Sequence, residues 1–162
     1  GNQADNSCYY PDRDSLYVLD LACEDAFYET YGINNGAAYV FTRSSGDWVQ
    51  EAYLKPASTF FTTLFGSSVD ISGDGNTLAV GAPQEASSAT GMNGNQADNT
   101  VWQAGAAYIY RRDGSTWNQR AYVKPMSTKM SLAFGRTLAL SADGHTLAVG
   151  ADNQFDGALY LY

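Results

Sequence analysis

The sequence predicts an all-β fold built from a repeated four-stranded antiparallel unit, and three observations lead to this prediction. Its 16 Gly and 12 Tyr, together with many Val, Ser and Thr, favour short strands joined by tight turns. Apolar residues show little recurrence at the 3.6-residue spacing of an amphipathic helix, so we expect helix to be scarce. Residues 36–82 also align without a gap with residues 105–151, and 24 of these 47 positions are identical.

The repeat divides the chain into units. Residues 1–35 form part of an inter-strand loop with a Cys-containing insertion, and 36–64 supply the third and fourth strands of a first unit. Residues 65–133 form a complete second unit with its linker, and 134–162 supply the first three strands of a third unit. The expected strands lie at 36–43, 47–55, 65–72, 77–82, 105–111 and 117–124, followed by three within 134–162. Tight turns are predicted by Asp-Gly pairs, at 74–75, 113–114 and 143–144.

The shared motifs of the two copies identify the type of unit. They are GAAY, AYLKP or AYVKP, Phe-Gly and TLAVGA, with a Trp at 48 and 117. A four-stranded antiparallel unit that recurs is typical of a propeller blade. The stretch FGSSVDISGDGNTLAVGAP at 65–83, followed by GAAYIY at 105–110, resembles the FG-GAP repeat of integrin α-subunit propellers and, more closely, its bacterial multi-repeat version.

The resemblance implies about two and a quarter blades of an incomplete β-propeller. A closed propeller needs about 4 to 8 blades. We therefore expect the remaining blades to come from the same longer chain or from other copies, and the sequence does not fix their total number.

Members of this family often hold calcium in the loop between the first two strands of a blade, through the pattern D-x-[DN]-x-D-G-x-x-D. Asp70, Ser72 and Asp74 match the first half of that pattern, but its closing Asp has no counterpart after Asn76. Two interpretations stay open. The three residues form a calcium site, or they belong to a plain hairpin turn in which their side chains bond backbone amides.

Charge argues against nucleic acid as a partner. The chain has 17 acidic and 9 basic side chains, a net charge of −8, and no basic cluster that would neutralise phosphates. No apolar run approaches the roughly 20 residues of a membrane helix, so we expect no membrane insertion. The single histidine, His145, occupies the turn position that Asn76 fills in the other copy. We expect it to be an exposed turn residue, and we expect no enzymatic activity.

The insertion Ser7 to Asn35 is the one feature that breaks the repeat. GNQADN occurs at 1–6 and 94–99, but the junction that follows is 24 residues longer after the first copy. Aromatic faces beside acidic side chains are typical of surfaces that recognise proteins or sugars, although such an insertion can also simply cover a blade edge. The residues we expect to bind a partner are Tyr9, Tyr10, Asp12, Asp14, Tyr17, Tyr28 and Tyr31.

Cys8 and Cys23 lie in the same insertion, without a spacing or a histidine cluster that suggests zinc. We expect them to form a disulfide, with two unpaired thiols as the alternative. A disulfide implies an oxidising compartment, so we expect an extracellular or cell-surface protein.

Three functions remain in competition. The first, implied by the integrin resemblance, is a non-catalytic extracellular module for binding, adhesion or structure, which recognises a protein or glycan through inter-blade loops and the loops between second and third strands. The second is an accessory propeller of a secreted carbohydrate-active enzyme. The third is a subunit of a surface assembly. The sequence does not identify the partner.

Overall fold

Short hairpins organise the chain into three antiparallel sheets. A computed structural model describes residues 35–57, 62–152 and 157–162. These residues contain nine strands and no helix, and so no helix that could cross a membrane. The strands are β1 (Ala38–Ser44), β2 (Asp47–Leu54), β3 (Ser68–Ile71), β4 (Thr77–Ala82), β5 (Ala106–Asp113), β6 (Thr116–Val123), β7 (Phe134–Leu140), β8 (Leu147–Asp152) and β9 (Gly157–Leu161).

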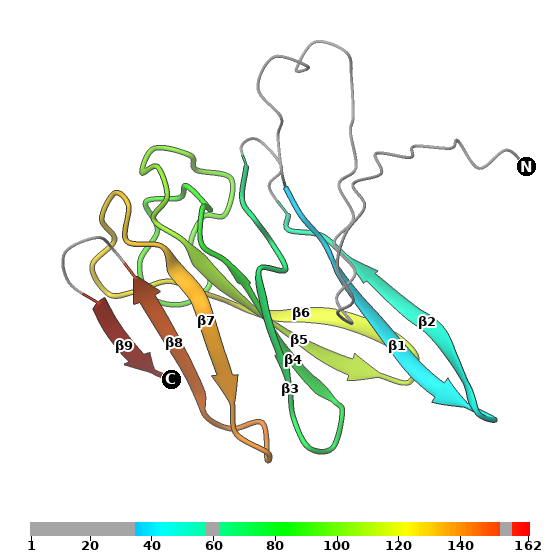
Figure 1. Cartoon of the computed structure of the whole chain (residues 1–162). Helices are drawn as coiled ribbons and strands as arrows, with labels where there is room; N and C mark the ends of the chain where they lie inside the picture. Colours follow the sequence, from blue (N-terminus) through cyan, green and yellow to red (C-terminus); the bar gives the residue numbers. More distant parts are fainter. Residues whose placement is uncertain (1–34, 58–61, 153–156) are drawn as a thin grey trace, which may run out of the picture.

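The sheets lie side by side in chain order (Figure 1). The first contains β1-β2, the second β3-β4-β5-β6 and the third β7-β8-β9, and every pair of neighbours is antiparallel. This arrangement confirms the all-β prediction of one complete blade between two partial ones. We call the three sheets the first, second and third blades.

Equivalent residues of the second and third blades occupy equivalent environments. Phe65 has its ring centroid 5.2 Å from that of Tyr108 and 6.3 Å from that of Tyr110. Phe134 lies 5.3 Å from Tyr160 and 6.1 Å from Tyr162, again edge to face. Both phenylalanines are fully buried. The Phe of the Phe-Gly motif therefore anchors each blade core against the aromatic residues of that blade's third strand.

The core consists of two clusters, one at each junction between blades. The first cluster joins the first and second blades and includes Val40, Leu54, Phe65 and Tyr108. The second joins the second and third blades and includes Ala79, Ala107, Phe134 and Val149. Because apolar burial is concentrated at these junctions, each blade depends on its neighbours for stability.

One predicted strand boundary is wrong. We expected a strand over 65–72, but β3 begins at Ser68. Gly66 has a φ of +91°, and a Cβ on this residue would lie 2.2 Å from the carbonyl oxygen of Ala37 in the preceding blade. Phe65 and Gly36 form a bridge between the blades at this point. At 65–66 the Phe-Gly motif is therefore a blade junction just before β3, whereas in the third blade β7 begins at the same motif, at Phe134.

Hydrogen bonds from side chains to backbone repeat at the two junctions. The hydroxyl of Tyr110 donates to the carbonyl oxygen of Lys55 in the first blade at 3.4 Å. Its counterpart Tyr162 donates to the carbonyl oxygen of Lys124 in the second blade at 2.9 Å. The lysine of the AYLKP or AYVKP motif thus supplies the same backbone acceptor to the following blade.

Candidate functional site

The predicted partner-binding residues of the insertion lie outside the described residues, as do Cys8 and Cys23. The partner-binding residues are Tyr9, Tyr10, Asp12, Asp14, Tyr17, Tyr28 and Tyr31. Their role and the disulfide stay predictions.

Of the three residues proposed for calcium, Asp70 lies on β3, and Ser72 and Asp74 lie in the turn between β3 and β4. Asp74 accepts hydrogen bonds from the Ser72 hydroxyl at 2.5 Å and from the Asn76 backbone and side-chain amides at 3.0 Å. These hydrogen bonds lower the pKa of Asp74 to about 2, and the bond from the Ser72 hydroxyl makes the largest contribution. Asp70 accepts from the backbone N–H of Leu140 in the third blade at 2.6 Å. Asp74 thus orders the turn, while Asp70 links two blades.

The corresponding turn between β7 and β8 has a similar arrangement. Asp143 accepts from the Ser141 hydroxyl and from the backbone amide of His145. The His145 side chain is 83% exposed and lies 3.6 Å from the carboxylate of Asp143. Within the described part of the chain, no group of three or more His, Cys, Asp or Glu gathers closely enough to hold a metal ion.

A buried ion pair lies at the opposite end of the second blade. The Nζ atom of Lys124, just after β6, is 2.7 Å from Oε2 of Glu85, just after β4. The lysine side chain is 0% exposed and that of the glutamate 2%. Burial lowers the pKa of Lys124, and the carboxylate of Glu85 opposes that shift. The other oxygen of Glu85 accepts from the backbone N–H of Ser87 at 2.9 Å.

Two tyrosines of the same region are also buried. Tyr108 on β5 and Tyr122 on β6 have ring centroids 5.2 Å apart, and both residues are 0% exposed. Burial raises the pKa of each phenol, with a further contribution from the charge of Glu85. Burial therefore holds both phenols in the neutral form.

The ion pair fixes one end of the loop 83–105, and further bonds fix the rest. Asp98 accepts from the backbone and side chain of Ser88 and from the hydroxyl of Thr100. These hydrogen bonds, led by that from the Ser88 side chain, lower the pKa of Asp98 to about 2. Asn93 accepts from the backbone N–H of Tyr122 at 2.9 Å through its side chain. The loop is consequently ordered by its own hydrogen bonds and joined to β6 through Asn93.

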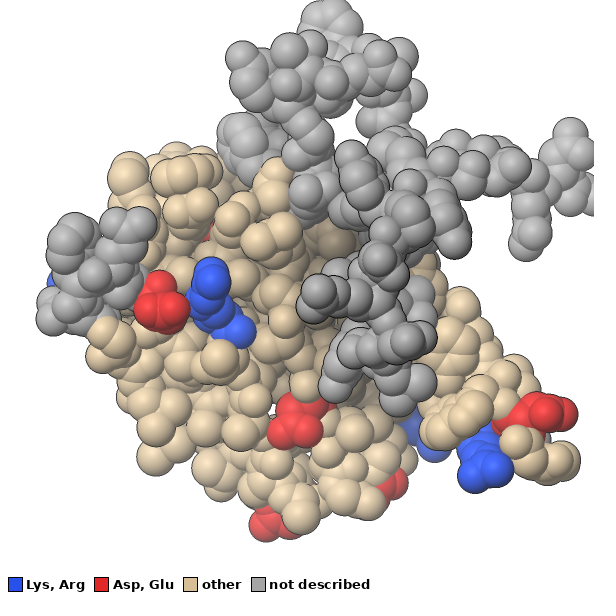
Figure 2. Space-filling view, viewed as in Figure 1, with Lys and Arg blue, Asp and Glu red and all other residues tan. Residues whose placement is uncertain are grey.

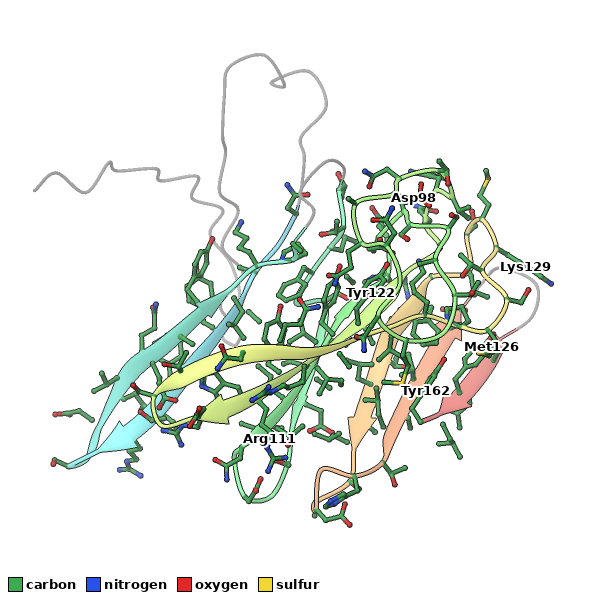
Figure 3. The ribbon with its side chains drawn as sticks, turned by 180° about the vertical axis from the view of Figure 1, so that it is seen from behind. Asp98, Arg111, Tyr122, Met126, Lys129 and Tyr162 are labelled. Carbon is green, nitrogen blue, oxygen red and sulfur yellow. The ribbon has the colours of Figure 1, made fainter. Side chains whose placement is uncertain are left out.

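Large apolar side chains are exposed on this loop and on the neighbouring linker 124–133. The backbone N–H of Ser131 in the linker donates to the carbonyl oxygen of Trp102 in the loop at 3.0 Å. Figure 3 labels Met126 and Lys129 on the linker and Asp98 on the loop. We call the four apolar residues the loop-end patch: Met92 (57% exposed), Trp102 (56%), Met126 (79%) and Met130 (64%).

A second surface feature is an open groove between β3 and β7. It has a volume of about 530 Å³ and is lined mostly by small and polar residues, including Ser67, Ser68 and Thr137. Arg136 lies at this groove and pairs with Asp152 at 3.6 Å. Charged side chains on the face shown in Figure 2 are scattered, without a cluster of one sign.

A comparison with protein families decides the assignment of the repeat. Residues 48–110, which run from β2 to β5, match the model of the FG-GAP repeat. This part of the chain is an FG-GAP repeat. FG-GAP repeats imply a β-propeller, and the three sheets are parts of its blades. No curated protein matches the chain.

The FG-GAP motifs account for the scaffold but not for the buried ion pair, which the sequence analysis missed. Lys124 belongs to the repeated KP dipeptide, and its counterpart is Lys55. The sequence offered one signal of this pair: both copies of the repeat have a lysine beside a buried strand. Its partner Glu85 lies 39 residues away in a loop, so the sequence pattern gave no means of pairing the two.

Proposed function

We propose that this FG-GAP protein is a non-catalytic, extracellular recognition module whose blades hold a partner-binding surface at one end. The partner is a protein or a glycan. One observation carries the proposal: a loop fixed to the blade by the Glu85–Lys124 ion pair exposes apolar side chains to solvent. Large exposed apolar side chains that gather on one part of a surface often mark an interaction site.

The character of the loop-end patch supports protein recognition. Three of its four residues are methionines, which are the only methionines of the chain. Methionine side chains are flexible and polarizable, so they adapt to an apolar partner surface. Trp102 adds the large aromatic area that binding hot spots favour.

The insertion Ser7 to Asn35 belongs to the same proposal. It lies between GNQADN and GAAY, as Thr100 to Ala104 do in the second copy. By its position in the repeat, the insertion corresponds to the segment that leads into the third strand of the second blade. We infer that the insertion adds specific contacts through its tyrosines and acidic residues.

The test is binding of the fluorescently labelled chain to intact cells of its source and to a glycan array. We expect saturable binding that the unlabelled chain competes away. Trp102→Ser combined with Met126→Ser should weaken binding at least tenfold, because both replacements remove apolar contact area. Val49→Ser is the matched control, because Val49 is 53% exposed on β2, outside the loop-end patch.

Deletion of residues 9–31 tests the insertion separately. A loss of binding with the blades still folded assigns specific contacts to it, whereas unchanged binding assigns it to covering a blade edge. If the Trp102→Ser/Met126→Ser variant and the Val49→Ser control bind equally well, the loop-end patch is not the partner-binding surface. Failure of the chain to bind either cells or glycans would reject the proposed function.

A further inference from the structure

All three methionines of the chain belong to the loop-end patch. Their exposed fractions are 57% for Met92, 79% for Met126 and 64% for Met130. Neither core cluster of the described residues contains a methionine. Methionine commonly fills irregular space inside a protein, but here every thioether stands at the surface and none contributes to the packing between blades.

Hydrogen bonds hold the backbone on which these side chains stand. The linker that follows β6 donates to the loop that precedes β5 from the N–H of Lys124 to the carbonyl oxygen of Gly91, at 2.8 Å. It donates again from the N–H of Ser131 to the carbonyl oxygen of Trp102. A Cβ added at Gly91 would lie 3.7 Å from Sδ of Met126, so this sulfur lies over the loop (Figure 3). The patch therefore presents its sulfur atoms on a fixed support.

A thioether that solvent reaches is open to oxidation by a peroxide. A lone pair of Sδ attacks one oxygen of hydrogen peroxide, so that an S–O bond forms as the O–O bond breaks. The sulfur loses two electrons and the peroxide gains them, and the departing hydroxide takes the proton of the transferred oxygen and leaves as water. The product, methionine sulfoxide, is polar where the thioether was apolar, and reductases reverse the change.

We propose that the loop-end patch is a reversible oxidation switch, in which hydrogen peroxide converts Met92, Met126 and Met130 to sulfoxides and thereby weakens partner binding. This inference rests on the proposed recognition function, because it concerns the regulation of the same patch. It adds a modification site and the chemical class of the oxidant.

Two features make the patch a switch rather than a site of damage. Because the core clusters contain no methionine, the added oxygen atoms displace nothing inside the blades, and the fold should survive oxidation. Each sulfoxide oxygen is a strong hydrogen-bond acceptor, and an apolar partner surface would have to dehydrate it without supplying a donor. Oxidation therefore acts on binding and leaves the scaffold intact.

The test compares one chain in three states: untreated, treated with hydrogen peroxide, and treated and then repaired with methionine sulfoxide reductases A and B, one for each sulfoxide epimer. Peptide mass mapping follows the three methionines, and thermal unfolding follows the fold. We expect oxidation at all three sites, an unchanged cooperative transition, and binding to source cells or glycans that weakens at least about tenfold, because several apolar contacts are lost together. Repair should restore binding.

The triple variant Met92→Leu/Met126→Leu/Met130→Leu is the matched control, because leucine keeps an apolar side chain at each site and has no sulfur to oxidise. Whatever the affinity of this variant, its binding should be the same before and after peroxide. Binding that falls equally in the variant, or that the reductases do not restore, would place the effect at another oxidised residue and would overturn the switch.

The outcomes separate this inference from the function on which it rests. If the untreated chain binds neither cells nor glycans, the proposed function fails and the switch fails with it. If the untreated chain binds, and the folded chain with all three sulfoxides binds as tightly, only the switch is overturned. Loss of the cooperative thermal transition on oxidation would identify damage instead, and it would also overturn the switch.

Discussion

The carboxylate of Glu85 and the ammonium group of Lys124 lie 2.7 Å apart, and solvent reaches almost none of either side chain. The two residues come from different connections of the second blade, one after β4 and one after β6. Their pairing therefore fixes the loop 83–105 relative to the linker that leads to the third blade. A buried charge pair is costly to dehydrate, so its removal has a different effect according to whether one or both charges are lost.

We predict that removing one member of this pair strongly destabilises the chain. Lys124→Met leaves the carboxylate of Glu85 buried without its counter-charge, and we expect a loss of about 3–5 kcal/mol in the free energy of unfolding. The double variant Glu85→Gln/Lys124→Met removes both charges and should be more stable than Lys124→Met alone. Urea unfolding followed by tryptophan fluorescence measures both. If the double variant is no more stable than Lys124→Met alone, the unpaired buried charge is not the cause.

Glycine at position 66 is predicted to be required by the close approach of two blades. Gly66→Ala places a Cβ 2.2 Å from the carbonyl oxygen of Ala37, in addition to the strain of a positive φ. Gly46→Ala is the matched control, because Gly46 has a φ of +99° but no atom within 4 Å of the added Cβ.

The control should cost about 1–2 kcal/mol from backbone strain alone. Gly66→Ala should cost roughly 1–3 kcal/mol more, because the blades must separate to accommodate the methyl group. Thermal unfolding of the two variants under identical conditions measures the difference. If Gly66→Ala and Gly46→Ala are equally stable, the close approach of the two blades is not the reason for the glycine of the Phe-Gly motif.

The acid dependence of the loop 83–105 should follow Asp98. Its pKa is lowered to about 2 from the ordinary value of 3.8, so the stabilisation is present above pH 3.8 and is lost as the pH falls toward 2. Titration of the Asp98 carboxyl by NMR should give this low pKa, and Ser88→Ala should raise it, because the Ser88 hydroxyl is the main cause of the shift. The pKa of Asp74 should stay near 2 in the same variant. An unchanged pKa of Asp98 in Ser88→Ala would contradict the assignment of the hydrogen bond.

The strands could be predicted from the sequence because each copy of the repeat supports the placement made from the other. TLAVGA at 77–82 coincides with β4, where all six residues are buried. The Asp-Gly turns at 74–75 and 113–114 separate strands as expected. Local signals of this kind act within a few residues, which is the range over which a sequence pattern is informative.

Contacts between blades could not be predicted in the same way. Glu51 and Trp117 are 66 residues apart, and nothing near either residue marks it as the partner of the other. Asp70 was singled out for a calcium motif, but its carboxylate accepts from the backbone of Leu140 in the next blade. Such pairs depend on how one blade packs on the next, and they become visible only when the blades are placed side by side.

The last prediction concerns calcium at Asp70, Ser72 and Asp74. Calcium prefers six to eight oxygen ligands, and here the carboxylate oxygens already accept hydrogen bonds from Ile71, Leu140, Ser72 and Asn76. A bound cation would have to replace these bonds and would still lack the closing acid of the family pattern. We therefore expect millimolar calcium to leave the melting temperature unchanged relative to EDTA. Asp74→Asn should lower the melting temperature equally in both solutions, because it weakens the turn itself. A rise in the melting temperature with calcium that Asp74→Asn abolishes would instead establish the calcium site.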